Sequence, residues 1–245
     1  MKLALIGFGA MGQLVAGHAQ AARDEIGLTL TSRAARSAAE LAELLRGHDA
    51  AIDFSVGSAV LTHVEACARA NVALVEGTTG WNARESEARL IVAEHAGALV
   101  YGANFSVGVN VFYHIVAHAA GLFQSLDGYS AFIEEAHHSR KRDAPSGTAI
   151  RLRDLVKEHL KREIPIASTR AGYIPGTHRA GFDSEADQIM LTHTARNREG
   201  FAAGALMAAH WIAGRKGVFE FSDVIDEILK AGDKLRTGGK NDNTN

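Results

Sequence analysis

The sequence predicts an α/β protein with two domains, the first a doubly wound parallel sheet of the Rossmann type and the second an α+β domain on a mainly antiparallel or mixed sheet. Three observations predict this. Strand-like and helical patterns alternate through the first part of the chain, as in parallel sheets. A glycine-rich turn separates the first strand from the first helix. Period-two patterns gather in the middle of the chain, as in antiparallel sheets.

The composition excludes several classes of protein. With 47% hydrophobic and 22% charged residues, the 245-residue chain is typical of soluble globular proteins. A formal net charge of -2 lacks the basic footprint of nucleic-acid binding, and no apolar run is long enough to span a membrane. The single cysteine, Cys67, favours a reducing compartment. We therefore expect a cytoplasmic protein with no nucleic-acid or membrane partner.

A glycine fingerprint follows the first predicted strand, Lys2–Ile6. Gly7 can make the turn, Gly9 can let a pyrophosphate approach, and Gly12 can allow close packing of helix on strand. We expect a dinucleotide to bind here, with a plain glycine turn as the alternative. The expected binding residues are Gly7, Phe8, Gly9, Ala10, Met11 and Gly12.

The end of the second predicted strand, Ile26–Thr31, indicates which dinucleotide binds. An acidic residue about 20 residues after the fingerprint would hold the ribose 2′-hydroxyl of NAD. The chain instead has Ser32 and Arg33, with Arg36 close behind. Because an arginine beside a hydroxyl suits a 2′-phosphate, NADPH is the preferred cofactor and NADH the second candidate.

Further alternating elements complete the first domain. Ligands of parallel sheets lie outside the carboxyl ends of the strands, where two more loops are expected to meet the cofactor. These loops are Gly77-Thr78-Thr79-Gly80 and Ala103-Asn104-Phe105-Ser106. The expected strands are Ala50–Phe54, Val72–Glu76 and Ala98–Tyr101, and the expected helices run from about Val60 to Ala68 and from Ala83 to His95.

A later predicted helix, running to Glu163, begins at a Pro-Ser-Gly-Thr turn. Ser146 is well placed as its N-cap. The first N–H groups of a helix have no intrahelical partner. Those of Gly147, Thr148 and Ala149 therefore predict a seat for an anion such as a substrate carboxylate.

The loop before this helix follows a predicted strand, Tyr129–Ala136, and carries His137, His138 and Lys141. Lys141 can add positive charge to the anion seat, and either histidine can donate a proton near neutral pH. If the strand persists through the pair, the two rings point to opposite faces, which argues against both binding one metal. The loop suits an acidic substrate whose reaction requires a proton, with a solvated basic turn as the alternative.

The remaining patterns predict few functional residues. His114 and His118 lie four apart on an apolar helix, Val109–Phe123, but no third ligand stands at zinc-site spacing, so we expect polar positions on a packed helix and no metal. The fold changes near Val107 and near Arg198. The other expected elements are strands Ala167–Arg170, Thr177–Phe182 and Gln188–Ala195, helix Phe201–Ile212, the stretch Gly217-Val218-Phe219 leading to a helix capped by Ser222, and a disordered tail, Thr237–Asn245.

Together these motifs resemble the 4-hydroxy-tetrahydrodipicolinate reductases, also called dihydrodipicolinate reductases, of the diaminopimelate route to lysine. The resemblance covers nearly the whole chain. It implies NAD(P)H-dependent reduction of 4-hydroxy-tetrahydrodipicolinate, via dihydrodipicolinate, to tetrahydrodipicolinate. The motifs that carry it are Gly7–Gly12, Gly77–Gly80, Ala103–Asn110 and, most specifically, Glu135-Ala136-His137-His138 through Lys141 to Asp143-Ala144-Pro145-Ser146-Gly147-Thr148-Ala149.

The resemblance also implies residue roles. It makes His137 the proton donor, Lys141 the catalytic cation and His138 a substrate contact. Substrate binding is further implied for Gly147, Thr148 and Arg198. Contact with the nicotinamide is implied for the backbone around Gly77, Thr78, Thr79, Ala103, Asn104 and Phe105.

At the level of domains, the resemblance implies that residues 1–107 plus 199–245 bind the dinucleotide. Residues 108–198 would bind the dicarboxylate substrate and join four subunits into a homotetramer. Ser32 departs from members that carry an acid before the arginine, which puts equal use of NADH in doubt. Two alternatives stay open: a reductase of another small carboxylated imine or aldehyde, and a catalytically silent dinucleotide-sensing protein.

Overall fold

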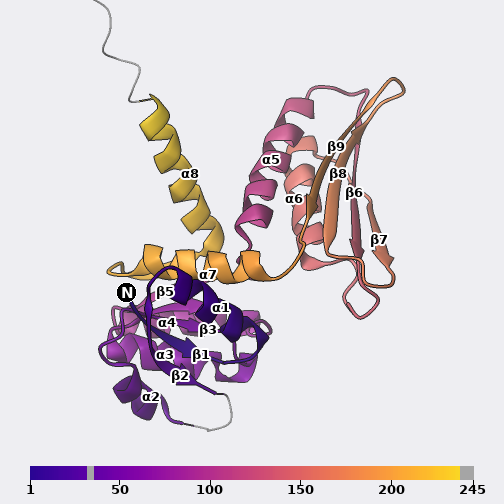
Figure 1. Cartoon of the computed structure of the whole chain (residues 1–245). Coiled ribbons are helices and arrows are strands. Elements are labelled where there is room, and N and C mark those ends of the chain that lie inside the picture. The colour runs from indigo at the N-terminus through magenta and orange to yellow at the C-terminus, as the bar shows by residue number, and fades with distance from the viewer. Residues whose placement is uncertain (32–35, 238–245) are drawn as a thin grey trace, which may run out of the picture. The chain divides into compact units, whose positions relative to one another are not determined.

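The computed structural model describes residues 1–31 and 36–237, and the chain separates into two compact units (Figure 1). Unit 1 comprises Met1–Val107 and the chain from Glu199 onward, and unit 2 comprises Gly108–Arg198. Ser32, Arg33 and the tail after Thr237 lie outside the described residues. No helix within the described ranges is long and apolar enough to cross a membrane.

Unit 1 contains a six-stranded parallel sheet with the order β10-β5-β4-β3-β1-β2. The direction of connection along the sheet reverses between β1 and β3, which is where ligands of such sheets bind. Strands β3, β4 and β5 are buried along their whole length, and are apolar except for the acids that end β3 and β4, because helices cover both faces. The strands are β1 (Lys2–Ile6), β2 (Glu25–Leu30), β3 (Ala50–Asp53), β4 (Ala73–Glu76), β5 (Ala98–Tyr101) and β10 (Gly217–Glu220).

Two helical layers enclose this sheet. Helices α2 (Ala38–Leu45), α3 (Val60–Ala70) and α4 (Glu85–Glu94) share one apolar cluster with the strands. Helices α1 (Ala10–Ala21) and α7 (Glu199–Ile212) pack against each other, and α7 lies against β3, β4 and β5. Two short 3₁₀ turns, Gly57–Ala59 and Asn82–Arg84, precede α3 and α4, and α8 (Phe221–Thr237) follows β10 directly.

Unit 2 contains a four-stranded mixed sheet with the order β7-β6-β8-β9, in which only the β6–β7 pair is parallel. Helices α5 (Val107–Phe123) and α6 (Gly147–Leu160) pack on one face of it, as Figure 1 shows. Phe182 of β8 stacks on Phe123 of α5 in this core, with ring centroids 4.4 Å apart. The strands are β6 (Ser130–His137), β7 (Ile166–Arg170), β8 (Thr177–Asp183) and β9 (Gln188–Thr194).

Three details of the predicted elements were wrong. Helix α2, which no sequence pattern predicted, is stabilised by a capping box between Ser37 and Glu40. Helix α6 ends at Leu160 and not at Glu163, because the next residue takes a left-handed conformation with φ 54°. Ser222 is not a cap: α8 begins one residue earlier and the Glu220 N–H donates to the Asp223 carboxylate.

Candidate active site

Strand β6 delivers two functional side chains to the interior of unit 2. Its residues alternate between the exposed face and the face covered by α5 and α6. Because of this alternation, Glu135 and His137 follow Ala131 and Ile133 into the buried row. Buried ionisable groups require partners, and the neighbouring strands supply them.

Glu135 is the centre of a buried hydrogen-bond network. Both its oxygens accept from the Arg170 guanidinium of β7, at 3.0 and 2.7 Å, and its Oε2 also pairs with Nδ1 of His137. Burial alone would raise the pKa of this carboxyl, but hydrogen bonds from Arg170 and Ser168 and the charges of His137 and Arg170 lower it to about 2. Glu135 is therefore an anion at every pH near neutrality.

A second histidine lies opposite Glu135 in the sheet. His178 of β8 is buried, its ring lies edge-on to that of His137 with centroids 5.1 Å apart, and its Nε2 lies 3.0 Å from Ser146 Oγ. Burial, together with the nearby His137, lowers the pKa of His178 to about 4. His178 is thus a neutral ring that helps to hold the start of α6.

Lys141 and His138 come from the loop after β6. The Lys141 ammonium lies 2.9 Å from the Asp143 carboxylate. Burial lowers the pKa of His137, Glu135 raises it, and the charges of Lys141 and Arg170 lower it further, with a net decrease. Nδ1 of His138 is buried without a hydrogen-bond partner.

The start of α6 is the candidate anion seat. Ser146 caps the helix as expected, with its Oγ accepting from the Ala149 N–H at 3.3 Å. The Ala149 N–H is consequently engaged, which corrects its predicted place among the free donors. Gly147 is exposed at the first helical position, and a Cβ there would meet no atom within 4 Å. An anion can therefore approach the backbone at Gly147 and, one residue on, at Thr148.

Glu135, His137 and His178 have the side-chain types of a metal site. Ligand atoms of Glu135, His137 and His178 lie within 4.8 Å of one another. However, Arg170 binds both carboxylate oxygens and Lys141 adds a second nearby cation, which opposes a metal ion. The donor set fits acid–base chemistry better than metal binding. His114 and His118 are exposed on α5 and belong to no such group of three within the described residues.

In unit 1, the turn between β1 and α1 has the geometry that a dinucleotide pyrophosphate requires. Gly7 has a φ of +83°, and a Cβ on it would come within 2.4 Å of the Phe54 carbonyl oxygen. A Cβ on Gly12 would lie 2.2 Å from the Gly7 carbonyl oxygen. A Cβ on Gly9, the cap residue of α1, would meet no atom within 4 Å. The first N–H groups of α1 are therefore open to a phosphate.

The loop after β4 is held by two buried acids that the sequence analysis missed. Glu76 accepts from the Thr78 N–H at 2.7 Å, and Asp53 of β3 accepts from the Thr78 hydroxyl at 3.5 Å. Thr78 Oγ1 in turn accepts from the Ser55 N–H at 3.0 Å. These bonds fix the Gly77–Gly80 loop against the end of β3. In the sequence, these two residues could have been found as acids at the carboxyl ends of the apolar strands β3 and β4.

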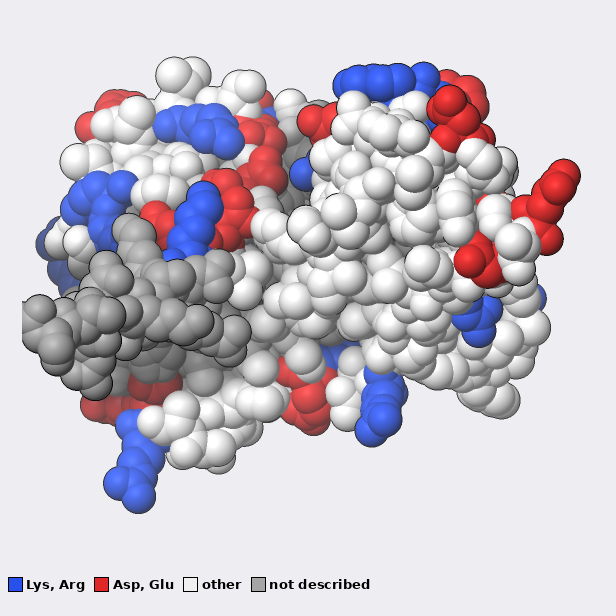
Figure 2. Space-filling view, turned by 90° about the horizontal axis from the view of Figure 1, so that it is seen from above, with Lys and Arg blue, Asp and Glu red and all other residues white. Residues whose placement is uncertain are grey.

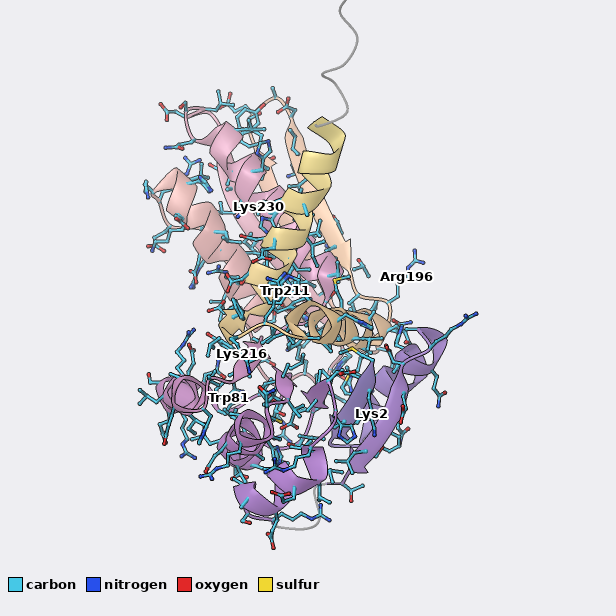
Figure 3. The ribbon with its side chains drawn as sticks, turned by 90° about the vertical axis from the view of Figure 1, so that its left-hand side faces the viewer. Lys2, Trp81, Arg196, Trp211, Lys216 and Lys230 are labelled. Carbon is cyan, nitrogen blue, oxygen red and sulfur yellow. The ribbon has the colours of Figure 1, made fainter. Side chains whose placement is uncertain are left out.

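Aromatic residues position the same loops. Trp81, labelled in Figure 3, donates its indole N–H to the Thr78 carbonyl at 2.9 Å and packs edge-on against Tyr101. Phe105 is 2% exposed and packs against Phe54 and Phe221. Its ring is therefore a core side chain, and a ligand can meet this residue only through its backbone.

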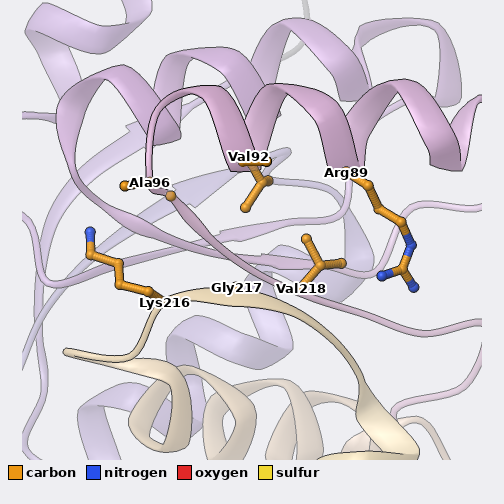
Figure 4. A pocket seen from close by; sticks show the side chains of 8 residues that line it. Arg89, Val92, Ala96, Lys216, Gly217 and Val218 are labelled. Atoms are coloured by element: carbon orange, nitrogen blue, oxygen red, sulfur yellow. The ribbon is translucent and has the colours of Figure 1, made fainter.

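Two other surface features lie apart from this chemistry. A pocket of about 320 Å³ in unit 1 is lined by residues of α4, of the turn before β5 and of the start of β10, including Ala96, Gly97 and Lys216 (Figure 4). It opens at the amino ends of these strands, the edge opposite the glycine loops. On the face shown in Figure 2, basic and acidic side chains are interspersed.

Comparison with known proteins identifies the family. A family model described as "Dihydrodipicolinate reductase, N-terminus" matches residues 1–105, and one described as "Dihydrodipicolinate reductase, C-terminus" matches residues 108–225. The chain belongs to the dihydrodipicolinate reductase family. It is accordingly an oxidoreductase that uses a nicotinamide dinucleotide, NADH or NADPH.

Relatives of the reductase family support this over the whole chain. A 4-hydroxy-tetrahydrodipicolinate reductase of Christiangramia forsetii is 37% identical over 94% of this chain and 100% of its own length. One from Anaeromyxobacter dehalogenans is 39% identical over 76% of both chains. The solved dipicolinate-bound dihydrodipicolinate reductase of Paenisporosarcina sp. TG-14 has a TM-score of 0.74 at 20% identity, over 90% of this chain and 97% of its own, and shows the fold.

Proposed function

We propose that the protein reduces 4-hydroxy-tetrahydrodipicolinate, via dihydrodipicolinate, to tetrahydrodipicolinate in the diaminopimelate route to lysine. The observation that carries this is the buried Glu135–His137 pair next to Lys141 and the open start of α6, in a unit that matches the C-terminal family model. The curated relatives bear the name of this reductase. The same family membership disfavours a silent sensor and a different substrate.

The chemistry of the site suits this reaction. Loss of water from the substrate gives a ring with a carbon–carbon double bond conjugated to an imine. A nicotinamide dinucleotide held by unit 1 would supply the hydride for a ring carbon, and the negative charge that develops toward the ring nitrogen would then need a proton. His137 gives up one proton to neutralise it, and Lys141 supports this as a cation. The product gains one hydride and one proton, which balances the reaction.

We propose that polar groups of unit 2, including Arg198, bind the substrate. Gly147 and Thr148 would hold one carboxylate through the backbone at the start of α6. His138, which follows His137 directly at the end of β6, would make a second polar contact. Arg198 is the exposed last residue of unit 2, and its guanidinium suits a carboxylate in a bidentate fork.

Cofactor binding is proposed for unit 1, with NADPH preferred over NADH. The open approach to Gly9 and the fixed Gly77–Gly80 loop support a dinucleotide there. The preference rests on the Ser32–Arg33 pair in the sequence. Initial rates with each cofactor should therefore be higher with NADPH. Ser32→Glu should shift the ratio of kcat/KM values toward NADH, and an unchanged ratio would remove this assignment.

A direct test uses substrate generated in place and follows cofactor oxidation. His137→Gln should lower kcat by about 100-fold or more, and Lys141→Ala should also lower it strongly, while cofactor binding stays near the wild-type value. His118→Gln, an exposed histidine on α5, is the matched control and should keep the wild-type rate. Full activity in both site variants would refute the proposal. A flat pyridine dicarboxylate should compete with the substrate.

We also propose a cytoplasmic homotetramer that associates through the sheet of unit 2. The support is that α5 and α6 cover only one face of this sheet, and that the part-buried apolar side chains of Phe132 and Met190 lie on the other face. Light scattering coupled to size exclusion should give about four times the 26.1-kDa chain mass. A monomer mass at micromolar concentration would rule this out.

A further inference from the structure

The hydrogen-bond roles within the Glu135–His137 pair follow from the charge state of Glu135. A carboxyl group whose pKa is about 2 is ionised near neutral pH and can only accept hydrogen bonds. The His137 nitrogen bonded to it, Nδ1, must therefore carry a proton. This fixes one of the two tautomers of the neutral ring and leaves Nε2 as the nitrogen that can exchange a proton.

Arg170 keeps the carboxylate from rotating away. Its guanidinium binds both oxygens of Glu135 and also donates to the backbone carbonyls of Thr169 and Asp143, at 2.8 and 2.6 Å. The Ser146 N–H gives the carboxylate a further contact at 3.3 Å. Glu135 is thus held by β7 and by the start of α6, and the orientation of the imidazole is set from outside its own strand.

The other edge of the His137 ring is bordered by a residue without a side chain. A Cβ on Gly176 would lie 3.1 Å from Nε2 and 3.2 Å from Cδ2. His178 does not compete as an acid, because its Nε2 is bonded to Ser146 and its pKa is about 4. Because position 176 has no side chain, Nε2 of His137 is not covered on that side. It is therefore the nitrogen that can exchange a proton.

We propose that Glu135, clamped by Arg170, is the positioning residue of His137: it holds Nδ1 as a donor and stabilises the imidazolium from which Nε2 gives up the proton. This rests on the proposed function, in which His137 is the acid. The charged and titratable groups facing the ring are Glu135, Lys141, Arg170 and His178. Of these only Glu135 favours the protonated ring.

The test compares Glu135→Gln with Glu134→Gln over a range of pH. Glu134 is the neighbouring acid on the same strand, but its side chain lies on the opposite face of the sheet from His137 and pairs with Arg179, so it is a matched control. As pH rises, kcat should fall when His137 loses its proton. In Glu135→Gln the anion that favours the protonated ring is gone, so this fall should move to lower pH, and kcat should drop about tenfold or more with little change in KM. Glu134→Gln should match the wild type.

A second variant and an NMR measurement distinguish loss of the positioning of His137 from damage to the fold. Glu135→Gln leaves the Arg170 cation without its partner, whereas the double variant Glu135→Gln/Arg170→Gln removes both charges and should fold. It should show the same loss of kcat. In ¹⁵N NMR of the histidine rings, the wild type should show Nδ1 protonated at neutral pH, and Glu135→Gln should lose this preference.

Two outcomes separate this inference from the proposed function. If His137→Gln is inactive while Glu135→Gln and the double variant keep the wild-type kcat and pH profile, the positioning role is wrong and the function stands. If His137→Gln itself keeps full activity, the proposed function is wrong, whatever Glu135→Gln shows.

Discussion

At the scale of single residues, the most unusual group outside unit 2 is Glu76. Its side chain is fully buried at the end of β4 and its Oε2 has no hydrogen-bond partner. Burial, and then the neighbouring Asp53 carboxylate, raise its pKa well above the ordinary value. An acid whose pKa is raised on folding binds its proton more tightly in the folded state. Its ionisation therefore destabilises the fold as pH rises above the unfolded value.

Replacement of Glu76 by Gln should stabilise the protein near neutral pH. The amide oxygen can still accept from the Thr78 N–H, and no buried charge or proton uptake is required. We expect a gain of about 1 kcal/mol or more in the free energy of unfolding at pH 7. Urea denaturation at pH 7 and pH 4 measures it. The gain should shrink at pH 4, and an equal gain at both values would contradict the explanation.

Gly176 is the second residue with a testable role. Its φ is not in the left-handed region, so alanine suits the backbone, but the new methyl group would press on Nε2 of His137. Gly176→Ala should lower kcat and leave the KM for the cofactor unchanged, because the dinucleotide is proposed to bind unit 1. Steady-state kinetics with varied cofactor check this. Gly128→Ala, where a Cβ meets nothing within 4 Å, is the control.

Residue-level prediction from sequence was limited by long-range pairing. The N-cap role of Ser146 was predictable, because it depends only on the next three residues. The partnership of Glu135 with His137 was within reach, since residues two apart on a strand share a face. Arg170 and His178 were not, because only the sheet register brings them beside Glu135. The burial of Asp53 and Glu76 likewise depends on how β3 and β4 pair.

At the scale of elements, α6 connects helix capping to the candidate site. Ser146 Oγ accepts from the Ala149 N–H and contacts His178 Nε2 at 3.0 Å. Ser146→Ala should cost about 1 kcal/mol for the lost cap and further stability for the unpaired buried histidine. Thermal unfolding measures the loss. Ser37→Ala, which removes the exposed cap of α2 without a buried partner, should cost less.

The elements that the sequence predicted well were the strongly periodic ones. The buried strand Ala98–Tyr101 has the predicted bounds, and most others differ by one or two residues at their ends. Helix α2 was missed because its apolar stripe is only eight residues long, although Ser37 and Glu40 have capping-box spacing. The end of α6 was misplaced because its polar last turn gives no periodic signal.

At the scale of the whole molecule, the chain leaves unit 1 at Val107 and returns at Glu199. Helix α7, from the returning part, covers the buried face of β3, β4 and β5, and β10 adds the last strand. A fragment of residues 1–107 lacks both elements, so it should not fold. A fragment of residues 108–198 keeps its own core and should show a cooperative unfolding transition. Circular dichroism of the two fragments tests this contrast.

The late position of β10 in the chain sets an order of events during synthesis. All of unit 2 is synthesised before α7 and β10, so unit 2 has its whole sequence while the first sheet still lacks an edge strand. Until then the apolar flank of β5 is open to wrong partners. We therefore expect nascent chains stalled before residue 199 to recruit chaperones more strongly than released ones.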